Sequence, residues 1–164
     1  MATPHIFDSI KAFQPFIQSW KLKSDTVVFT NGCFDLLHAG HVFVLEEAAK
    51  LGQRLVVGIN SDESIAGLKG PHRPILPLAE RMAMVASLRC VDAVIAFDTP
   101  TPEHLIQEIS PDILVKGGDY TPETTVGAAW VKAYGGKVVI IPLKPGWSTT
   151  HIIEKIKTQT LSKL

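Results

Sequence analysis

Two histidines three residues apart stand where a strand is expected to lead into a helix. The stretch from Thr30 to His41 reads TNGCFDLLHAGH, and His38 and His41 lie at its end. An apolar run, residues 27–29, precedes it, and an amphipathic helical pattern follows. Backbone N–H groups and the positive end of a helix attract anions at such a turn, and residues at i and i+3 share one side of a helix. The pair is therefore suited to gripping a phosphate chain.

Paired imidazoles beside phosphate suit reactions at phosphorus, of which nucleotidyl transfer is one. In that reaction a phosphate oxygen of the acceptor attacks the α-phosphorus of a nucleoside triphosphate, and negative charge grows on the equatorial and leaving oxygens. Imidazole N–H donors backed by a helix N-terminus stabilise this charge without a nucleophile. Other interpretations of His38 and His41 remain open. The two residues could cap the helix, pack in the core, or bind a metal, although a third and a fourth protein ligand are not evident.

The residues around the pair also allow more than one interpretation. Gly32 and Gly40 let the backbone approach phosphate closely. Asp35 is either a turn residue that bonds its own backbone or an organiser of the histidines or the acceptor. Asp62 near the end of the second strand would suit the ribose of a dinucleotide, but the first loop lacks the Gly-x-Gly-x-x-Gly pattern of dinucleotide-binding folds.

Apolar β-branched runs alternate with helical patterns along the chain. The runs predict five buried strands at residues 27–30, 55–59, 93–97, 113–115 and 138–141. Helices are expected at residues 41–51, 78–88, 103–109, about 125–133 and about 149–157, and an N-terminal helical extension at residues 1–24. Strands without clean alternation are covered on both faces, and alternation with helices implies parallel pairing. The sequence predicts one α/β domain over residues 1–164, a doubly wound Rossmann-like fold with a five-stranded parallel sheet flanked by helices.

The chemically distinctive segments all follow expected strands. They are Thr30–His41 after the first strand, Asn60–Asp62 after the second, Lys116–Tyr120 after the fourth and Gly146–Thr150 after the fifth. Ligands of open α/β sheets bind beyond the carboxyl ends of the strands, where the strand order reverses. We therefore expect one site to which all four segments contribute.

Composition narrows the class of protein. The chain has 164 residues, of which 46% are hydrophobic and 20% charged, and its formal net charge is zero. A protein without basic excess does not bind nucleic acid by bulk electrostatics. The two cysteines, Cys33 and Cys90, are typical of reduced thiols rather than of a disulfide framework. Neither a signal peptide nor an apolar run near the length of a spanning helix is evident, so we expect a soluble cytoplasmic protein with no membrane or nucleic-acid partner.

The segment GCFDLLHAGH resembles the His-x-Gly-His motif of the cytidylyltransferase-like nucleotidyltransferase superfamily. Further motifs follow in order: SDES at 61–64, LKG at 68–70, RP at 73–74, LAERM at 78–82, LVKGGDY at 114–120 and STT at 148–150. The ordered set is similar to the heptose 1-phosphate adenylyltransferase branch of that superfamily. The resemblance runs from about Asp25 to the end of the sequence.

This resemblance implies an enzyme that transfers AMP from ATP to D-glycero-β-D-manno-heptose 1-phosphate for lipopolysaccharide core synthesis. It also implies Mg²⁺ with the ATP, a separate heptose kinase that supplies the sugar 1-phosphate, and self-association. A cytidylyltransferase acting on glycerol 3-phosphate or a similar small phosphate is the nearest alternative. A non-catalytic nucleotide sensor on the same fold is an alternative from another class.

The resemblance carries phosphate stabilisation to His38 and His41, and we place Lys69 and Asp35 with them as catalytic residues. The nucleotide is expected to contact Thr30, Asn31, Gly32, Cys33, Phe34, Gly40, Lys116, Gly117, Asp119, Ser148, Thr149 and Thr150. The substrate is expected to contact Asn60, Arg73 and Arg81, and residues 70–74 to form a mobile loop over the site. Relatives carry a basic residue where Ile153 stands here, and Lys144 is a candidate replacement. No resident protein-bound metal is predicted.

Overall fold

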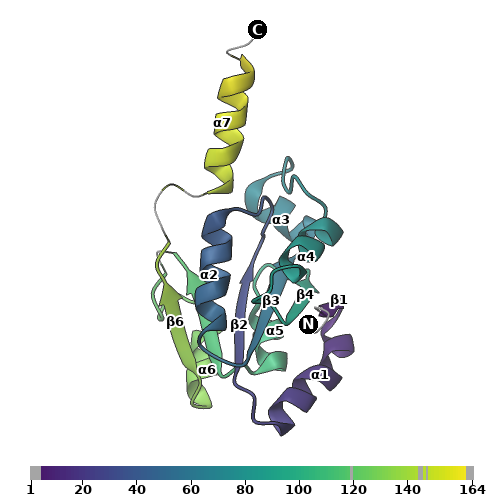
Figure 1. Cartoon of the computed structure of the whole chain (residues 1–164), viewed down its shortest axis with the longest axis vertical. Coiled ribbons are helices and arrows are strands. Elements are labelled where there is room, and N and C mark those ends of the chain that lie inside the picture. Colours follow the sequence, from purple (N-terminus) through teal and green to yellow (C-terminus); the bar gives the residue numbers. More distant parts are fainter. Residues whose placement is uncertain (1–4, 119, 144–145, 147, 162–164) are drawn as a thin grey trace.

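Six parallel strands form a single sheet at the centre of the molecule (Figure 1). The structure is a computed structural model and describes residues 5–118, 120–143, 146 and 148–161. Its strands are β1 (His5–Phe7), β2 (Val27–Gly32), β3 (Arg54–Asn60), β4 (Ala93–Phe97), β5 (Ile113–Gly117) and β6 (Lys137–Ile141). Their spatial order is β1-β4-β3-β2-β5-β6, and every neighbouring pair runs parallel.

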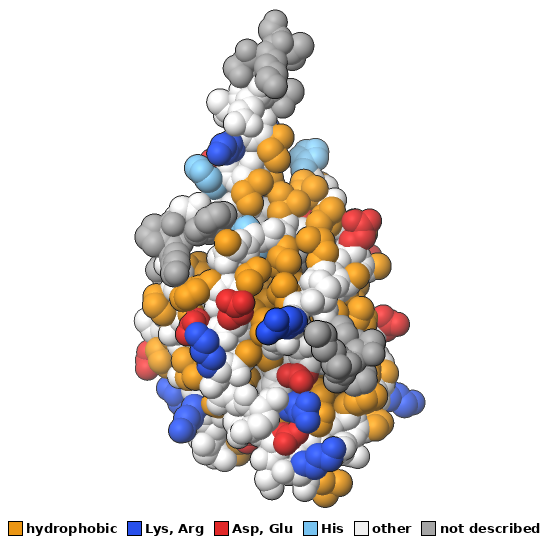
Figure 2. All heavy atoms as spheres, in the orientation of Figure 1, with side chains coloured by type: hydrophobic (Ala, Val, Ile, Leu, Met, Phe, Trp, Pro, Cys, Tyr) orange, Lys and Arg blue, Asp and Glu red, His pale blue; other side chains and the backbone are white. Residues whose placement is uncertain are grey.

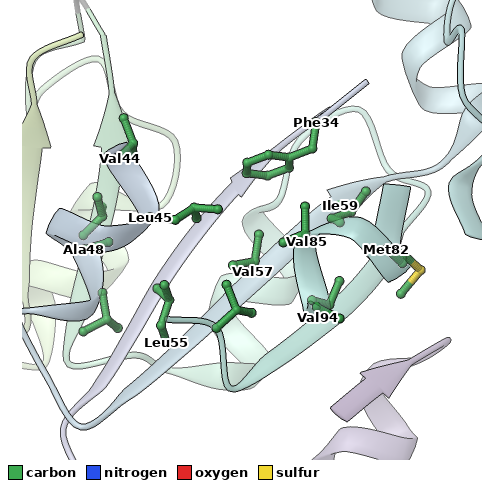
Figure 3. Packing of buried hydrophobic residues seen from close by; sticks show 14 of the residues in the cluster. Phe34, Val44, Leu45, Ala48, Leu55, Val57, Ile59, Met82, Val85 and Val94 are labelled. Atoms are coloured by element: carbon green, nitrogen blue, oxygen red, sulfur yellow. The ribbon is translucent and has the colours of Figure 1, made fainter. Parts of the chain in front are cut away.

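Helices cover both faces of this sheet. They are α1 (Ile10–Leu22), α2 (Ala39–Ala49), α3 (Asp62–Lys69), α4 (Leu78–Ala86), α5 (Glu103–Ile109), α6 (Ala128–Ala133) and α7 (Thr149–Leu161). Buried residues of α2 and α4 pack on one face, and buried residues of α1, α5 and α6 on the other. Figure 3 shows the first of these clusters, in which Leu55, Val57 and Ile59 of β3 meet Leu45 of α2 and Val85 of α4. Alternate residues of a strand point to opposite faces, so Val56 joins the other cluster.

The expectation of five strands is wrong by one. The extra strand, β1, has three residues and pairs with β4 at the edge of the sheet. The helix expected in the N-terminal region is present as α1, whose Phe13, Ile17 and Trp20 are buried. A three-residue strand offers too little alternation to be read from sequence, and β1 is held mainly by its place beside β4 and by Phe7, whose ring lies 5.0 Å from that of Phe13.

Helix α3 was not expected either. It begins after Ser61, whose side chain accepts a hydrogen bond from the N–H of Ser64, and Asp62 and Glu63 fill its first turn. A serine cap followed by acidic residues is an ordinary start of a helix. The other expected helices are present, with α6 beginning three residues later and α7 ending four residues later than predicted.

The topology places the loop after β2 at the switch in strand order. The chain passes from β2 through α2 to β3 on one side, and β5 later pairs with β2 on the other side. Crevices that bind ligands form at this point in doubly wound folds. The segment with the histidine pair therefore lies where a ligand is expected. No helix among the described residues is long and apolar enough to cross a lipid bilayer.

Charges of both signs are mixed over the visible face of the molecule. Figure 2 shows Lys and Arg side chains interspersed with Asp and Glu, mostly over the lower half, and a broad hydrophobic area above them. This face carries no large patch of one sign, which agrees with the net charge of zero. On this face, attraction for an anion would come from local groups rather than from a broad basic patch.

Candidate active site

The two histidines open helix α2 and bond each other's backbone. His38 is the N-cap residue, and its Nδ1 accepts a hydrogen bond from the N–H of His41 at 3.4 Å. In return, Nδ1 of His41 accepts from the N–H of His38, also at 3.4 Å. The imidazole rings are stacked, with centroids 3.8 Å apart and planes inclined by 18°. The two histidines therefore do cap the helix, as one of the interpretations held. Because each ring uses Nδ1 for the cap, its Nε2 is left for a ligand.

Both imidazoles are held in the neutral form. Burial lowers the pKa of His38. Burial, followed by the positive charges of His38 and Lys69, lowers the pKa of His41 to about 4. Near neutral pH the pair thus offers N–H donors without a positive charge on either ring. The positive charge of Lys69 thus acts on His41.

Phe34 anchors the loop between β2 and the histidines. Its ring is buried at the end of β2, where Figure 3 shows it within the first apolar cluster, and it lies 5.1 Å from the ring of His41. The backbone of Phe34 has φ +47°, a left-handed conformation that non-glycine residues adopt rarely. A Cβ at Gly32 would come within 3.0 Å of the Phe34 ring. Gly32 and Phe34 were predicted to contact the nucleotide, and the structure gives both a part in positioning the loop.

Asp35 ties the loop after β2 to the segment that precedes α4. Its carboxylate, 1% exposed, accepts hydrogen bonds from Nε of Arg73 and from the N–H groups of Ile75 and Leu76, the latter two at 2.7 and 3.0 Å. Burial alone would raise the pKa of Asp35, but these hydrogen bonds outweigh it and lower the pKa. The expected loop over the site is therefore fastened at residues 73–76. Asp35 organises this segment, a role that neither of its two interpretations named.

The segments that follow the carboxyl ends of the strands form the rim of the candidate site. Arg81 lies among them and is fully buried. Its guanidinium donates to the carbonyls of Leu76, Cys33 and Asn60 at 3.0, 2.6 and 2.8 Å, and to the carboxylate of Asp62 at 2.7 Å. The structure does not support a direct contact of Arg81 with substrate, because its donors are engaged by the protein. Arg81 instead joins the carboxyl ends of β2 and β3 to α3 and to the segment before α4.

Asn60 and Thr30 also face inward. Asn60 is buried and its side-chain amide donates to Ser64 Oγ at 3.0 Å, so it holds α3 rather than offering itself to substrate. Thr30 is 3% exposed within β2. Direct ligand contacts were predicted for both residues, and burial of their side chains argues against them.

Lys116 and Asn31 bring the ends of β5 and β2 together. The ammonium of Lys116 donates to Oδ1 of Asn31 at 2.7 Å and lies 5.5 Å from the centre of the Tyr120 ring. Burial lowers the pKa of Lys116, and the neighbouring Cys33 opposes that shift. Next to it, a Cβ at Gly117 would meet the side chain of Val44 at 3.1 Å. Lys116 and Gly117, both predicted to contact the nucleotide, therefore lie next to the end of β2 and the start of α2.

The start of α7 completes the rim. Ser148 Oγ accepts from the N–H of His151, so this residue caps the helix. Thr149 Oγ1 donates to the carbonyl of Leu36 at 3.5 Å, which places the first turn of α7 beside the loop after β2. Thr150 is exposed, and Gly40 is buried in the first turn of α2. Asp119 and Lys144 lie outside the described residues.

Asp62 and Tyr120 contribute in ways that the sequence pattern does not predict. Asp62 accepts both from Arg81 and, at 3.3 Å, from the N–H of Leu78, so it links the starts of α3 and α4. The pattern suggests Asp62 only as a ribose ligand. Tyr120, half exposed, lies beside Lys116 and Gly118. Its place at the end of the KGGDY motif was the available signal.

No group of three or more His, Cys, Asp or Glu side chains among the described residues converges on a possible cation. The carboxylate nearest the histidines in sequence, Asp35, is fully engaged by Arg73 and two backbone N–H groups. The donor set in view does not fit a resident metal centre. It fits a polyanion held by neutral and cationic hydrogen-bond donors.

A model of the family described as cytidylyltransferase-like matches residues 29–161, which include every segment of this rim. The chain belongs to the cytidylyltransferase-like family of nucleotidyltransferases. Its first turn of α2, with the histidine pair, lies within the matched region.

The chain is also similar to curated proteins of several bacteria. The chain is 58% identical over 134 residues to the bifunctional protein HldE of Syntrophotalea carbinolica, covering 82% of this chain and 27% of that protein. It is 50% identical over 157 residues to the bifunctional protein HldE of Vibrio vulnificus, covering 96% of this chain and 32% of that protein. The chain thus spans about a third of the length of these relatives or less.

Among solved structures, the lipopolysaccharide core biosynthesis protein of Thermoplasma volcanium is 31% identical with a TM-score of 0.59, covering 73% of this chain and 97% of that one. The pantoate-beta-alanine ligase of Francisella tularensis has a TM-score of 0.63 at 18% identity, covering 86% of this chain and 67% of that one. The second likeness establishes the Rossmann-like fold alone.

Proposed function

We propose that this chain transfers AMP from ATP to D-glycero-β-D-manno-heptose 1-phosphate, giving ADP-heptose and pyrophosphate for lipopolysaccharide core synthesis. The observation that carries the reaction type is the stacked imidazole pair at the N-terminus of α2, at the switch in strand order. The likeness to HldE proteins and to a lipopolysaccharide core biosynthesis protein supports the acceptor.

In the proposed reaction, an oxygen of the sugar 1-phosphate attacks the α-phosphorus of ATP, a new P–O bond forms, and pyrophosphate leaves. His38 and His41 donate N–H groups to the phosphate oxygens on which charge develops. Lys69, whose positive charge acts on His41, adds a further attraction for the phosphates. The backbone N–H groups at the start of α2 and of α7 favour the same anion.

Arg73 is the proposed contact to the acceptor phosphate. Its Nε is engaged by Asp35, whereas its Nη2 is buried and has no hydrogen-bond partner among the described residues. Buried donors are almost always paired in folded proteins. A phosphate oxygen of the acceptor would supply that partner, and the fixed orientation of the guanidinium by Asp35 would prepare it.

Mg²⁺ enters this proposal with ATP. Mg²⁺ is commonly held by substrate phosphates and waters rather than by an all-protein cage, and it would neutralise the triphosphate and the pyrophosphate. The proposal assigns no protein ligand to the ion. A kinase that phosphorylates the anomeric hydroxyl of a heptose must supply the acceptor. Self-association and cytoplasmic location stay predictions.

A substrate panel tests the function. Pyrophosphate release is measured with ATP or CTP, each combined with D-glycero-β-D-manno-heptose 1-phosphate or glycerol 3-phosphate. The proposal expects rapid release only with ATP and the heptose phosphate. Preference for CTP and glycerol 3-phosphate would establish the cytidylyltransferase alternative, for which the family description is the supporting observation. ATP binding without release for any acceptor would favour a nucleotide sensor.

A further inference from the structure

The start of α2 is a capping box built from two histidines. In this motif the N-cap side chain accepts from the N–H of the third helical residue, whose own side chain accepts from the N-cap N–H. Ser or Thr usually fills the first position and Glu or Gln the second. Here His38 and His41 fill them, and both use Nδ1 as the acceptor, at 3.4 Å each.

A nitrogen that accepts a hydrogen bond carries no proton, so a neutral imidazole that accepts through Nδ1 has its hydrogen on Nε2. We propose that reciprocal capping fixes both imidazoles as neutral Nε2–H tautomers, so that each histidine positions the phosphate-binding N–H of the other. The part of the inference that says these N–H groups bind phosphate rests on the proposed function. The tautomers themselves follow from the geometry of the free chain.

The coupling between the two rings runs through the backbone of the first turn. The N–H of His41 donates both to the carbonyl of His38 at 2.9 Å and to Nδ1 of His38 at 3.4 Å. Without the His38 side chain it keeps the carbonyl and loses the second acceptor, which holds the first turn and the His41 ring less firmly. Without the His41 side chain, the N–H of His38 loses its side-chain acceptor altogether. Each ring is therefore a positioning residue for the other as well as a phosphate ligand.

Three further observations favour neutral rings. The stacking distance of 3.8 Å would bring two like charges into contact if both rings were protonated. The ring of Phe34 lies 5.1 Å from that of His41 and carries no compensating charge, and the positive charge of Lys69 opposes protonation of His41. Burial lowers the pKa of both histidines, in agreement with this arrangement.

Nitrogen NMR of the full chain labelled with ¹⁵N-histidine tests the tautomers directly. Long-range nitrogen–proton correlations distinguish an Nε2–H ring from an Nδ1–H ring, and the substitutions His38→Asn and His41→Gln assign the two signals. At pH 7.5 we expect pure Nε2–H patterns for both rings. Exposed His104 on α5 offers a control, since His104→Asn should leave both patterns unchanged. An Nδ1–H pattern, or averaging between tautomers, in either ring overturns the inference.

Paired substitutions test the coupling. Asn at position 38 and Gln at position 41 are ordinary capping residues that keep an acceptor but remove the imidazole, whereas Ala removes both. We expect His38→Asn to keep the melting temperature and the Nε2–H pattern of His41, and His38→Ala to lower the first and blur the second. His41→Gln and His41→Ala should differ in the same way. Equal melting temperatures and equal patterns for the Asn and Ala variants would contradict the coupling.

These readouts separate the inference from the proposed function. A chain with two Nε2–H rings that releases no pyrophosphate with any substrate keeps the inference and removes the function. A chain that is active as an adenylyltransferase but carries an Nδ1–H ring keeps the function and overturns the inference.

Discussion

At the scale of single residues, the site is held by side chains that bond the backbone of neighbouring segments. Arg81 shows this most clearly, because its fully buried guanidinium donates hydrogen bonds to three carbonyls and one carboxylate. Charged hydrogen bonds of this kind are stronger than neutral ones. The rim therefore depends on residues that need not touch a ligand.

Replacing Arg81 should lower the free energy of unfolding more than replacing an exposed arginine does. Arg81→Met leaves the carbonyls of Cys33 and Asn60 without a donor, and breaking a buried charged network costs about 3–5 kcal/mol. We expect the free energy of unfolding in urea to fall by about 3 kcal/mol or more. Arg89 is exposed near the end of α4 and serves as the control, with a change under about 0.5 kcal/mol for Arg89→Met. Equal losses would show that the buried network does not stabilise the fold.

The lowered pKa of His41 makes stability depend on pH in a defined window. In the unfolded chain an ordinary histidine takes up a proton near pH 6.5, whereas His41 in the folded chain resists protonation until about pH 4. The unfolded state thus binds more protons between these values, and stability falls as pH drops from 6.5 toward 4. Urea unfolding at pH 7.5 and 5.0 should show this loss, and His41→Gln should reduce it. An unchanged loss in the variant would assign it to other groups.

At the scale of elements, the rim consists of segments tied to the loop after β2. Asp35 fastens residues 73–76, Arg81 joins the ends of β2 and β3, Lys116 bonds Asn31, and Thr149 bonds Leu36. Each tie joins segments far apart in the sequence. The arrangement gives the loop after β2 a fixed shape before any ligand arrives, which is the preorganisation that electrostatic catalysis requires.

Loss of the Asp35 carboxylate should free the segment before α4. In Asp35→Asn, Arg73 loses its counter-charge and the N–H groups of Ile75 and Leu76 lose a strong acceptor. A hydrogen bond to a charged group contributes about 1.5–3 kcal/mol, so amide exchange at Ile75 and Leu76 should accelerate about tenfold or more. The KM for the acceptor should rise more than the KM for ATP. Asp98→Asn, at an exposed carboxylate after β4, should change neither. Unaltered exchange at both amides would contradict the proposed tie.

At the scale of the whole molecule, the C-terminal helix stands apart from the packed layers. Figure 1 shows α7 extending beyond the end of the sheet, and neither apolar cluster includes a residue from it. Its first turn is joined to the loop after β2 by the hydrogen bond from Thr149 Oγ1 to the carbonyl of Leu36. The helix therefore contributes to the site more than to the core.

Truncation separates these two contributions. A chain that ends at residue 146 should unfold cooperatively with a melting temperature near that of the full chain. It should bind ATP about 10- to 100-fold more weakly, because hydrogen bonds to a charged phosphate contribute about 1.5–3 kcal/mol. A chain that ends at Lys157 keeps the hydroxyl residues of the first turn and should bind ATP as the full chain does. Equal ATP affinity in both truncated chains would remove α7 from the site.

The sequence was informative about the sheet interior and the location of the site. Long β-branched runs such as that of β3 have one stable solution, burial on both faces, and strand ends define the rim of a parallel sheet. The sequence did not predict features that depend on contacts with residues far away in the chain. β1 is a strand because β4 offers it an edge, and Arg81 is buried because three carbonyls and Asp62 surround it.

The roles of single site residues were the least predictable from the sequence. The pattern indicated phosphate chemistry at His38 and His41, but spacing alone cannot show that the two rings cap one helix through Nδ1. Likewise, a conspicuous Arg or Asn near a strand end can serve the ligand or the scaffold, and only the partners of Arg81 and Asn60 distinguish these roles. Burial and hydrogen-bond partners come from the fold as a whole, not from neighbours in sequence.

The most direct test of the account is the rate of pyrophosphate release by the double variant His38→Asn, His41→Gln, with ATP and D-glycero-β-D-manno-heptose 1-phosphate. Both substitutions keep an acceptor for each backbone N–H of the first turn, so helix α2 should remain capped and the chain folded. We predict that turnover falls by about three orders of magnitude or more, since positioned charge-stabilising donors contribute about 10²–10³ each. A folded double variant that turns over at close to the wild-type rate would contradict the claim that the paired imidazoles stabilise the transferred phosphate.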